Sequence, residues 1–319
     1  MRAFLLVLIV FASFLSCEKE SSNLVDTSNI KVDFSVSRFD VDFYTSSATN
    51  LSEIKEKYPL LFPVETPDSV WIQKINDKDE LELFSETQKI YENFSEVEQD
   101  LRSFFTYVKY YNKGFETPNV ITVLSNIDYE NRIIYSDSLL FLSLDVYLGK
   151  EHPFYADYPG YIKHNNTKAH IAVDVANKLI EKQFPLNKDR TFISKIIHEG
   201  KKAFARDLYL PLTLSSEKLG YTVDKLNWVV ENEVQIWKYF IGNDLLYSTD
   251  PELNKRFLDK APFSKFYLRE DSLSPGEVGV WIGLQIVHSY MRSNDVSLQE
   301  LMSKNTSEVF KNSKYKPRK

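Results

Sequence analysis

The chain has 319 residues, and its 45 acidic side chains against 39 lysines and arginines give a formal net charge of −6. This mild acidity, without a basic stripe, argues against a nucleic-acid partner, because binding to a phosphate backbone relies on clustered lysine and arginine. Hydrophobic residues make up 43% of the chain, which predicts a globular body with a sizeable core rather than a disordered one.

The first predicted element is a lipoprotein signal at residues 1–16. Arg2 precedes an apolar run from Ala3 to Leu15, and Ser16 stands directly before Cys17, the only cysteine. The run is shorter than the roughly 20 residues that span a bilayer, so we expect cleavage before Cys17 and acylation of its thiol. No thiol would then remain for a disulfide or a metal. An ordinary signal peptide and an uncleaved helical anchor are the alternatives.

After the signal we expect a flexible, lipidated tether at residues 17–29 and one globular domain at residues 30–319. The tether is predicted because the segment is polar and rich in serine, asparagine and acidic residues. A subdivision of the domain near residue 165 is left open.

The domain is predicted to be mainly helical with a small sheet in the middle of the chain. One strand is expected within residues 30–43, and short apolar runs bounded by turn residues predict three more. Those three runs are at 120–124, 132–135 and 139–144. Apolar residues at helical spacing predict the helices. The helices are expected at 51–57, from Asp68 onward, at 79–111 (two helices, separated by a capping box of Ser95 and Glu98), and at 168–183, 189–208, 224–242, 276–292 and 297–303.

The expected fold class is therefore α+β, with a partly antiparallel sheet. The helix at 276–292 is almost wholly apolar and is expected to be the spine of the core. Its glycines, Gly276, Gly279 and Gly283, suit close contact between helices better than phosphate binding.

One motif is close to a catalytic one. His198 and Glu199 begin a His-Glu-x-x-His pattern, in which two histidines one helical turn apart bind zinc and the glutamate serves as base. Lys202 replaces the second histidine, and a protonated lysine has no lone pair for a metal. Glu231 and Glu233, on the next long helix, could supply an acidic third ligand.

Three interpretations of this motif are open. The dipeptide is a coincidence on a polar helix face, or it belongs to a working zinc hydrolase with a distant histidine as a further ligand. In the third interpretation the site is degenerate, and Lys202 pairs with Glu199 or Glu231 and supplies the charge that a metal once gave. We expect no catalytic residue, bound metal or cofactor.

Tyr155, Tyr158 and Tyr161 lie in a segment, residues 152–161, that contains two prolines and a glycine. We expect an irregular, ordered loop. Its tyrosines are either packed against the body or exposed as a surface for a protein partner or a glycan.

Short motifs follow one another in a characteristic order over nearly the whole chain after the signal. They are SRFD at 37–40, KYP at 57–59, LYLP at 208–211, GYT at 220–222, ENE at 231–233, LLYSTD at 245–250, APFS at 261–264, SPG at 274–276 and WIGLQIV at 281–287. Together with the lipoprotein signal, this set resembles the GldB family of gliding motility lipoproteins from Bacteroidota.

The resemblance implies an envelope lipoprotein that is required for, or supports, gliding motility and its associated secretion machinery. That family is distantly similar to predicted zinc-dependent proteases, which implies a degenerate zincin-like fold. We expect a non-catalytic scaffold or a partner-stabilising role, with protein partners in the gliding and secretion apparatus and the bilayer bound through acylated Cys17. A zinc hydrolase with a non-standard site and a glycan- or lipid-binding lipoprotein are the alternatives. The body is expected to face the periplasm, although surface exposure fits the same signal.

Overall fold

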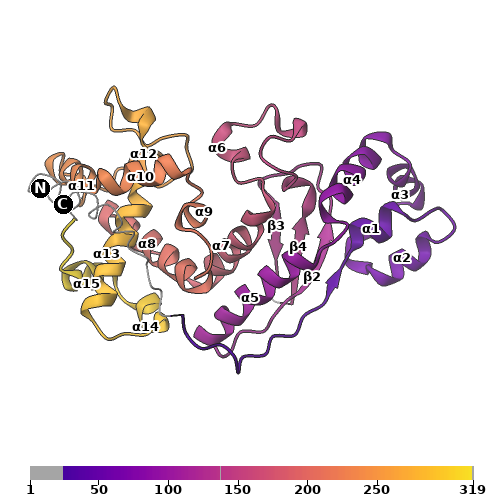
Figure 1. Cartoon of the computed structure of the whole chain (residues 1–319), viewed down its shortest axis with the longest axis horizontal. Coiled ribbons are helices and arrows are strands. Elements are labelled where there is room, and N and C mark those ends of the chain that lie inside the picture. The colour runs from indigo at the N-terminus through magenta and orange to yellow at the C-terminus, as the bar shows by residue number, and fades with distance from the viewer. Residues whose placement is uncertain (1–23, 137, 318–319) are drawn as a thin grey trace, which may run out of the picture.

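A four-stranded mixed sheet lies between a small group of N-terminal helices and a larger helical part (Figure 1). The computed structural model describes residues 24–136 and 138–317. The predicted signal and Cys17 lie outside these residues. Within them the chain is mainly helical with one small sheet, which confirms the predicted α+β class.

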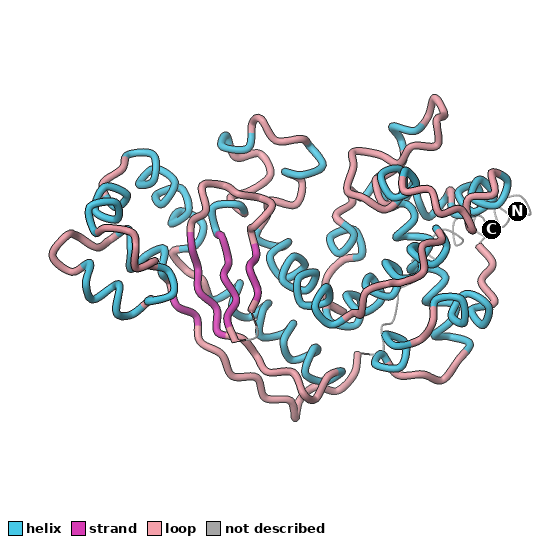
Figure 2. The backbone as a smooth tube through the Cα atoms, turned by 180° about the vertical axis from the view of Figure 1, so that it is seen from behind, coloured by secondary structure: helices cyan, strands magenta, loops and turns pink. Residues whose placement is uncertain are grey.

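The sheet has the strand order β1-β2-β4-β3. β1 (Val36–Ser37), β2 (Asn119–Val123) and β4 (Leu139–Ser143) are parallel, and β3 (Ile133–Tyr135) pairs with β4 in the antiparallel sense. Figure 2 shows the strands side by side from behind. β3 is thus an edge strand, and the prediction of a partly antiparallel sheet is confirmed.

The N-terminal helices pack around a small aromatic cluster of their own, at the β1 side of the sheet. They are α1 (Phe39–Tyr44), α2 (Leu51–Lys57), α3 (Asp68–Ile75) and α4 (Lys78–Tyr91). The buried members of the cluster are Phe43, Tyr44, Leu51, Tyr58, Phe62 and Ile75.

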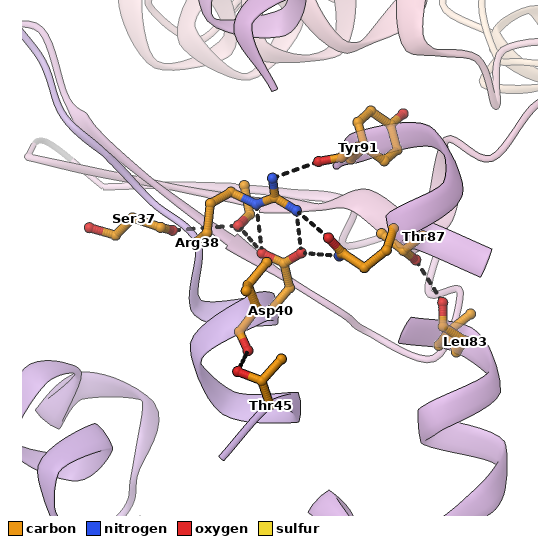
Figure 3. Close-up of polar contacts among 10 residues, drawn as sticks. Ser37, Arg38, Asp40, Thr45, Leu83, Thr87 and Tyr91 are labelled. Carbon is orange, nitrogen blue, oxygen red and sulfur yellow. Dashed lines mark hydrogen bonds and ion pairs between the residues drawn. The ribbon is translucent and has the colours of Figure 1, made fainter. Parts of the chain in front are cut away.

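A network of polar side chains ties this group to the sheet (Figure 3). Arg38 binds the Asp40 carboxylate through two of its nitrogens, at 2.9 and 2.7 Å, and donates to the Tyr91 carbonyl at 2.7 Å. Asp40 is fully buried and also accepts hydrogen bonds from Gln88, at 3.0 Å, and from the Thr122 hydroxyl. The network thereby joins α1 to α4 and β2, and every charge in it has a partner.

α5 (Ser95–Tyr111) follows, but the predicted capping box at its start is wrong. Ser95 is the first helical residue, and its backbone N–H and hydroxyl both donate to the Asn93 side chain, at 2.9 and 2.6 Å. Asparagine bonds readily to a backbone N–H two residues on, and here it replaces the serine as the group that orders the start of the helix.

The helices after the sheet form the larger part of the molecule. They are α6 (Gly160–Lys163), α7 (Ile171–Gln183), α8 (Phe192–Tyr209), α9 (Ser215–Leu219), α10 (Val223–Glu231), α11 (Glu233–Gly242), α12 (Glu252–Phe257), α13 (Val278–Ser293), α14 (Leu298–Ser303) and α15 (Thr306–Ser313). The predicted helix over 224–242 is in fact two helices, because Asn232 ends α10 and bonds through its side chain to the Trp228 carbonyl. The main apolar core runs from Phe34 to Val309 and includes residues from both sides of residue 165.

α13 is the spine of this part, as predicted, and it packs most extensively on α8. The two backbones meet where Gly200 faces Gly283, and a Cβ atom on Gly283 would lie 2.0 Å from the Ile196 carbonyl oxygen. Gly279 meets α12 at Phe257, whereas Gly276 lies ahead of the helix. Close helix contact is therefore confirmed for Gly283 and Gly279 and is wrong for Gly276.

Candidate functional site

A cleft of about 670 Å³ lies between the sheet edge and the larger helical part. β3 and the α6 segment line one side, and residues from 218–225, 260–262 and 275–280 line the other. α7 and α8 also line it and run beneath α6 and α9 in the view of Figure 1.

Both of these helices present a polar stripe to the cleft. The stripe on α7 is Asp174, Asn177, Lys178 and Glu181, and the stripe on α8 is Glu199, Lys202 and Arg206. The residues of each stripe are three or four positions apart, which places them on one helix face. The remaining faces of both helices are mostly apolar and buried in the core.

Asp174 is the most highly connected carboxylate of the cleft. It accepts a hydrogen bond from the Tyr147 hydroxyl at 2.9 Å, pairs with Arg132 at 3.3 Å and lies 3.6 Å from His170. Burial favours its neutral form, but His170, Arg132 and the Tyr147 hydroxyl outweigh burial and hold the pKa of Asp174 below its ordinary value of 3.8. His170 is also 2.7 Å from Glu217, whose pKa this hydrogen bond lowers.

These lowered pKa values predict how stability depends on acidity. As pH falls, Asp174 and Glu217 take up protons more readily in the unfolded chain than in the folded one. Their contribution to the free energy of unfolding is therefore complete above about pH 5 and is lost as pH falls further. We expect Asp174→Asn to flatten the acid limb of the unfolding free energy, measured by urea denaturation at a series of pH values. Asp157→Asn, at an exposed site, is the control. An unchanged acid limb in Asp174→Asn would contradict this account.

The predicted catalytic dipeptide is divided between two environments. Glu199 and Lys202 line the cleft, and their side chains pair at 2.8 Å, which is one of the two pairings that the degenerate interpretation predicts. His198 does not line the cleft. Its ring contacts Phe184 edge-on, with centroids 6.2 Å apart, and burial together with the charge of Lys202 lowers its pKa.

The two glutamates considered as a third ligand do not join this site. Glu231 is exposed, and Glu233, only 3% exposed, accepts a hydrogen bond from the Tyr315 hydroxyl at 2.8 Å. Neither lines the cleft. Over residues 24–136 and 138–317, no group of three or more histidine, cysteine, aspartate or glutamate side chains is arranged to hold a metal ion.

The predicted partner surface at the three tyrosines needs correction. Tyr155 is fully buried. Its hydroxyl donates to the Asp145 carbonyl at 2.6 Å and accepts from the Leu148 N–H at 2.9 Å, so its polar atom is satisfied inside the protein. Tyr158 is half-buried and donates to a backbone carbonyl. Tyr161 alone of the three lines the cleft, so a stacking platform of three exposed tyrosines for a glycan is not formed.

Glu277, which the sequence analysis missed, is held in the cleft by a left-handed backbone with φ of 56°. A non-glycine residue is uncommon there and persists only where its surroundings fix it. The Tyr221 hydroxyl donates to the Gly276 carbonyl at 2.9 Å, and the Val278 N–H donates to the Ser264 hydroxyl at 3.3 Å. Burial raises the pKa of Glu277, although the charges of Lys260 and Arg206 oppose the rise.

Arg206 and Lys260 are two further cleft residues that the motif search missed. Arg206 donates to the Asn177 side chain at 2.7 Å, while its buried Nε has no hydrogen-bond partner among the described residues. In the part of the chain that the structure describes, neither Arg206 nor Lys260 forms an ion pair. Arg206 lies seven residues after Glu199, so helical spacing places both residues on the same face of α8. This spacing is the sequence feature that could have predicted Arg206 as a site residue.

The family model of the gliding motility protein GldB matches residues 20–317 of the chain. The chain therefore belongs to the GldB family, which makes it a gliding motility-related envelope lipoprotein. Neither the curated proteins nor the solved structures contain a match to it. None of the helices described is both long and apolar enough to cross a membrane. The likeness to zincin metallopeptidases stays a prediction.

Proposed function

We propose that this lipoprotein supports gliding, and the secretion machinery associated with gliding, by binding and stabilising a partner protein rather than by catalysis. The observation that carries the proposal is the ion pair between Lys202 and Glu199, at 2.8 Å. The ammonium lies against the carboxylate that a zinc hydrolase would use as its base. The pair engages this carboxylate within the protein, and it puts an ammonium at the position that the second histidine of a zinc site would take.

The cleft supports the binding half of the proposal. Its volume of about 670 Å³ falls within the range of roughly 300–1,000 Å³ that is typical of ligand sites. Its polar groups stand on rigid helices, α7 and α8, which is how precise binding sites are usually built. An acylated Cys17 on a flexible tether would hold this body at the membrane while leaving it free to reach a partner.

The experiment is mild crosslinking of cells that produce the full chain with an affinity tag, followed by purification from the envelope fraction. We expect other proteins of the gliding and secretion apparatus to be recovered with it. Cells that produce the untagged chain set the background. Recovery of nothing beyond that background would contradict a partner-binding role.

A further inference from the structure

We propose that the cleft binds the carboxyl terminus of a partner polypeptide, with the terminal carboxylate held between Arg206 and Lys260. The inference rests on the proposed function, because it names the part of the partner that the cleft would take. Three features of the cleft lead to it: the positive charge left unpaired in it, the position of Arg206 at its floor, and the apolar side chains that line it.

The cleft carries excess positive charge within an acidic protein. Seven lysine and arginine side chains line it against five carboxylates, whereas the whole chain has a net charge of −6. Four of the seven pair with a carboxylate, and Lys225 donates to the carbonyls of Ser272 and Ser274. Among the described residues Arg206 and Lys260 form no ion pair, so the positive charge available to a ligand is concentrated on these two side chains.

The guanidinium of Arg206 is held in place but only partly satisfied. Nη1 donates to the Asn177 side chain at 2.7 Å, whereas neither Nε nor Nη2 donates a hydrogen bond to any described residue. The bond to Asn177 joins α8 to α7, and these two helices run beneath α6 and α9 in Figure 1, so the guanidinium is fixed at the floor of the cleft. A guanidinium with N–H groups to spare binds a carboxylate through strong, charge-assisted hydrogen bonds.

Lys260 reaches the same part of the cleft from the side that residues 260–262 form. The charges of Lys260 and Arg206 both act on the Glu277 carboxyl group and oppose the rise that burial causes in its pKa. Both cations therefore lie near one point of the cleft, where a single carboxylate can meet them. Lys260 is exposed, so a ligand can reach it. The raised pKa of Glu277 favours its neutral form, which lessens its repulsion of an incoming anion.

The rest of the cleft surface favours a chain end over a free inorganic anion. Half-buried apolar side chains line it, among them Tyr161, Ile162, Leu219 and Val280, and these can pack against the last side chains of a polypeptide. The volume of about 670 Å³ is that of a small-ligand site, so it admits only a few residues. A chain that ends in the cleft brings its carboxylate to the floor more readily than a chain that must enter and leave. Capture of a terminal carboxylate is an established mode of peptide recognition.

The test uses the purified mature lipoprotein in a non-ionic detergent and three mixtures of short randomised peptides that contain no other acidic residue. One mixture has a free carboxyl terminus, one is amidated, and one is amidated but carries a single internal glutamate, so the first and third have the same charge. Peptides retained by the protein are counted by mass spectrometry. We expect the free-terminus mixture to be retained about tenfold better than the amidated one, as one charge-assisted hydrogen bond suffices for this. The internal glutamate should recover little of the difference, because its carboxylate does not reach the floor.

The preference for a free carboxyl terminus should be lost in Arg206→Gln and in Lys260→Gln. It should persist in Lys265→Gln and Arg292→Gln, which remove exposed charges outside the cleft. Thermal melting shows whether Arg206→Gln is folded, and Lys260→Gln changes an exposed side chain that makes no ion pair with a described residue. A photoreactive group on the penultimate residue of a retained peptide should crosslink to the segments that line the cleft.

The inference is overturned if the free-terminus mixture is retained no better than the amidated one, or no better than the mixture with an internal glutamate. An unchanged preference in a folded cleft variant, or crosslinks only outside the cleft, would overturn it as well. The two proposals fail separately. If partners are recovered by crosslinking in cells but the peptides show no preference, the cleft does not bind a chain end and the partner-binding role stands. If the preference is found but no partner is recovered, the cleft binds chain ends and the partner-binding role in gliding is contradicted.

Discussion

Replacing Arg38 with methionine is expected to lower the free energy of unfolding by about 3–5 kcal/mol, because it leaves the Asp40 carboxylate buried without its counter-charge. Asp40 is completely inaccessible to solvent, and Arg38 supplies two of its hydrogen bonds. The same change removes the hydrogen bond from Arg38 to the Tyr91 carbonyl, so α4 loses a contact with the segment before α1. Urea denaturation of the purified protein measures the loss.

Two controls separate this pair from ordinary surface charge. The double variant Arg38→Met, Asp40→Leu should recover much of the loss, since a buried pair replaced by apolar side chains is often nearly neutral. Lys55→Ala breaks a surface pair with Asp68 and should cost less than about 1 kcal/mol. A loss in Arg38→Met no larger than in Lys55→Ala would mean that the network in Figure 3 does not stabilise the fold.

Gly283→Ala is expected to lower the free energy of unfolding by roughly 3 kcal/mol or more. This is the upper end of the cost of overpacking a core. A Cβ atom at this position would lie 2.0 Å from the Ile196 carbonyl oxygen, and no rotamer change can relieve a clash with backbone. α13 would have to move away from α8, and these two helices form the most extensive contact in the larger helical part. The free energy of unfolding, measured by urea denaturation, and the melting temperature should both be lower than in the wild-type protein.

Gly242→Ala is the matched control for this substitution. Gly242 also lies in a helix, as the last residue of α11, but a Cβ atom there would meet no atom of the described residues within 4 Å. Alanine is favoured over glycine in helices by up to about 1 kcal/mol, so we expect a neutral or slightly stabilising effect. Equal stability of Gly283→Ala and Gly242→Ala would refute the close crossing of α8 and α13.

Much of the secondary structure could be predicted from the sequence, because local patterns determine it. Short apolar runs between turn residues placed three strands to within about two residues, and the apolar helix at 276–292 is α13. The break at Asn232 could not be seen, because the apolar spacing continues across it while a side-chain hydrogen bond ends the helix. The strand order could not be predicted from local patterns either, since β1 pairs with β2, which lies more than 80 residues away in the sequence.

The site was harder to predict than the fold. The motif around His198 predicted Glu199 and Lys202 as site residues, and both line the cleft. The same motif predicted His198, which does not line the cleft. Arg206 lies in α8, Lys260 follows α12 and Glu277 directly precedes α13, so no local spacing connects them. Only the long-range packing of α8 against α13 and the loop before α13 brings these charges together.

The central claim, that an anchored body acts by binding rather than by catalysis, is tested most directly by the spreading of a deletion strain on a surface. The strain is complemented with the wild-type chain, with Cys17→Ala or with His198→Ala, at equal protein levels by immunoblot. The account predicts full spreading with His198→Ala and none with Cys17→Ala. Loss of spreading with His198→Ala, together with stoichiometric zinc in the wild-type protein that this variant lacks, would contradict it.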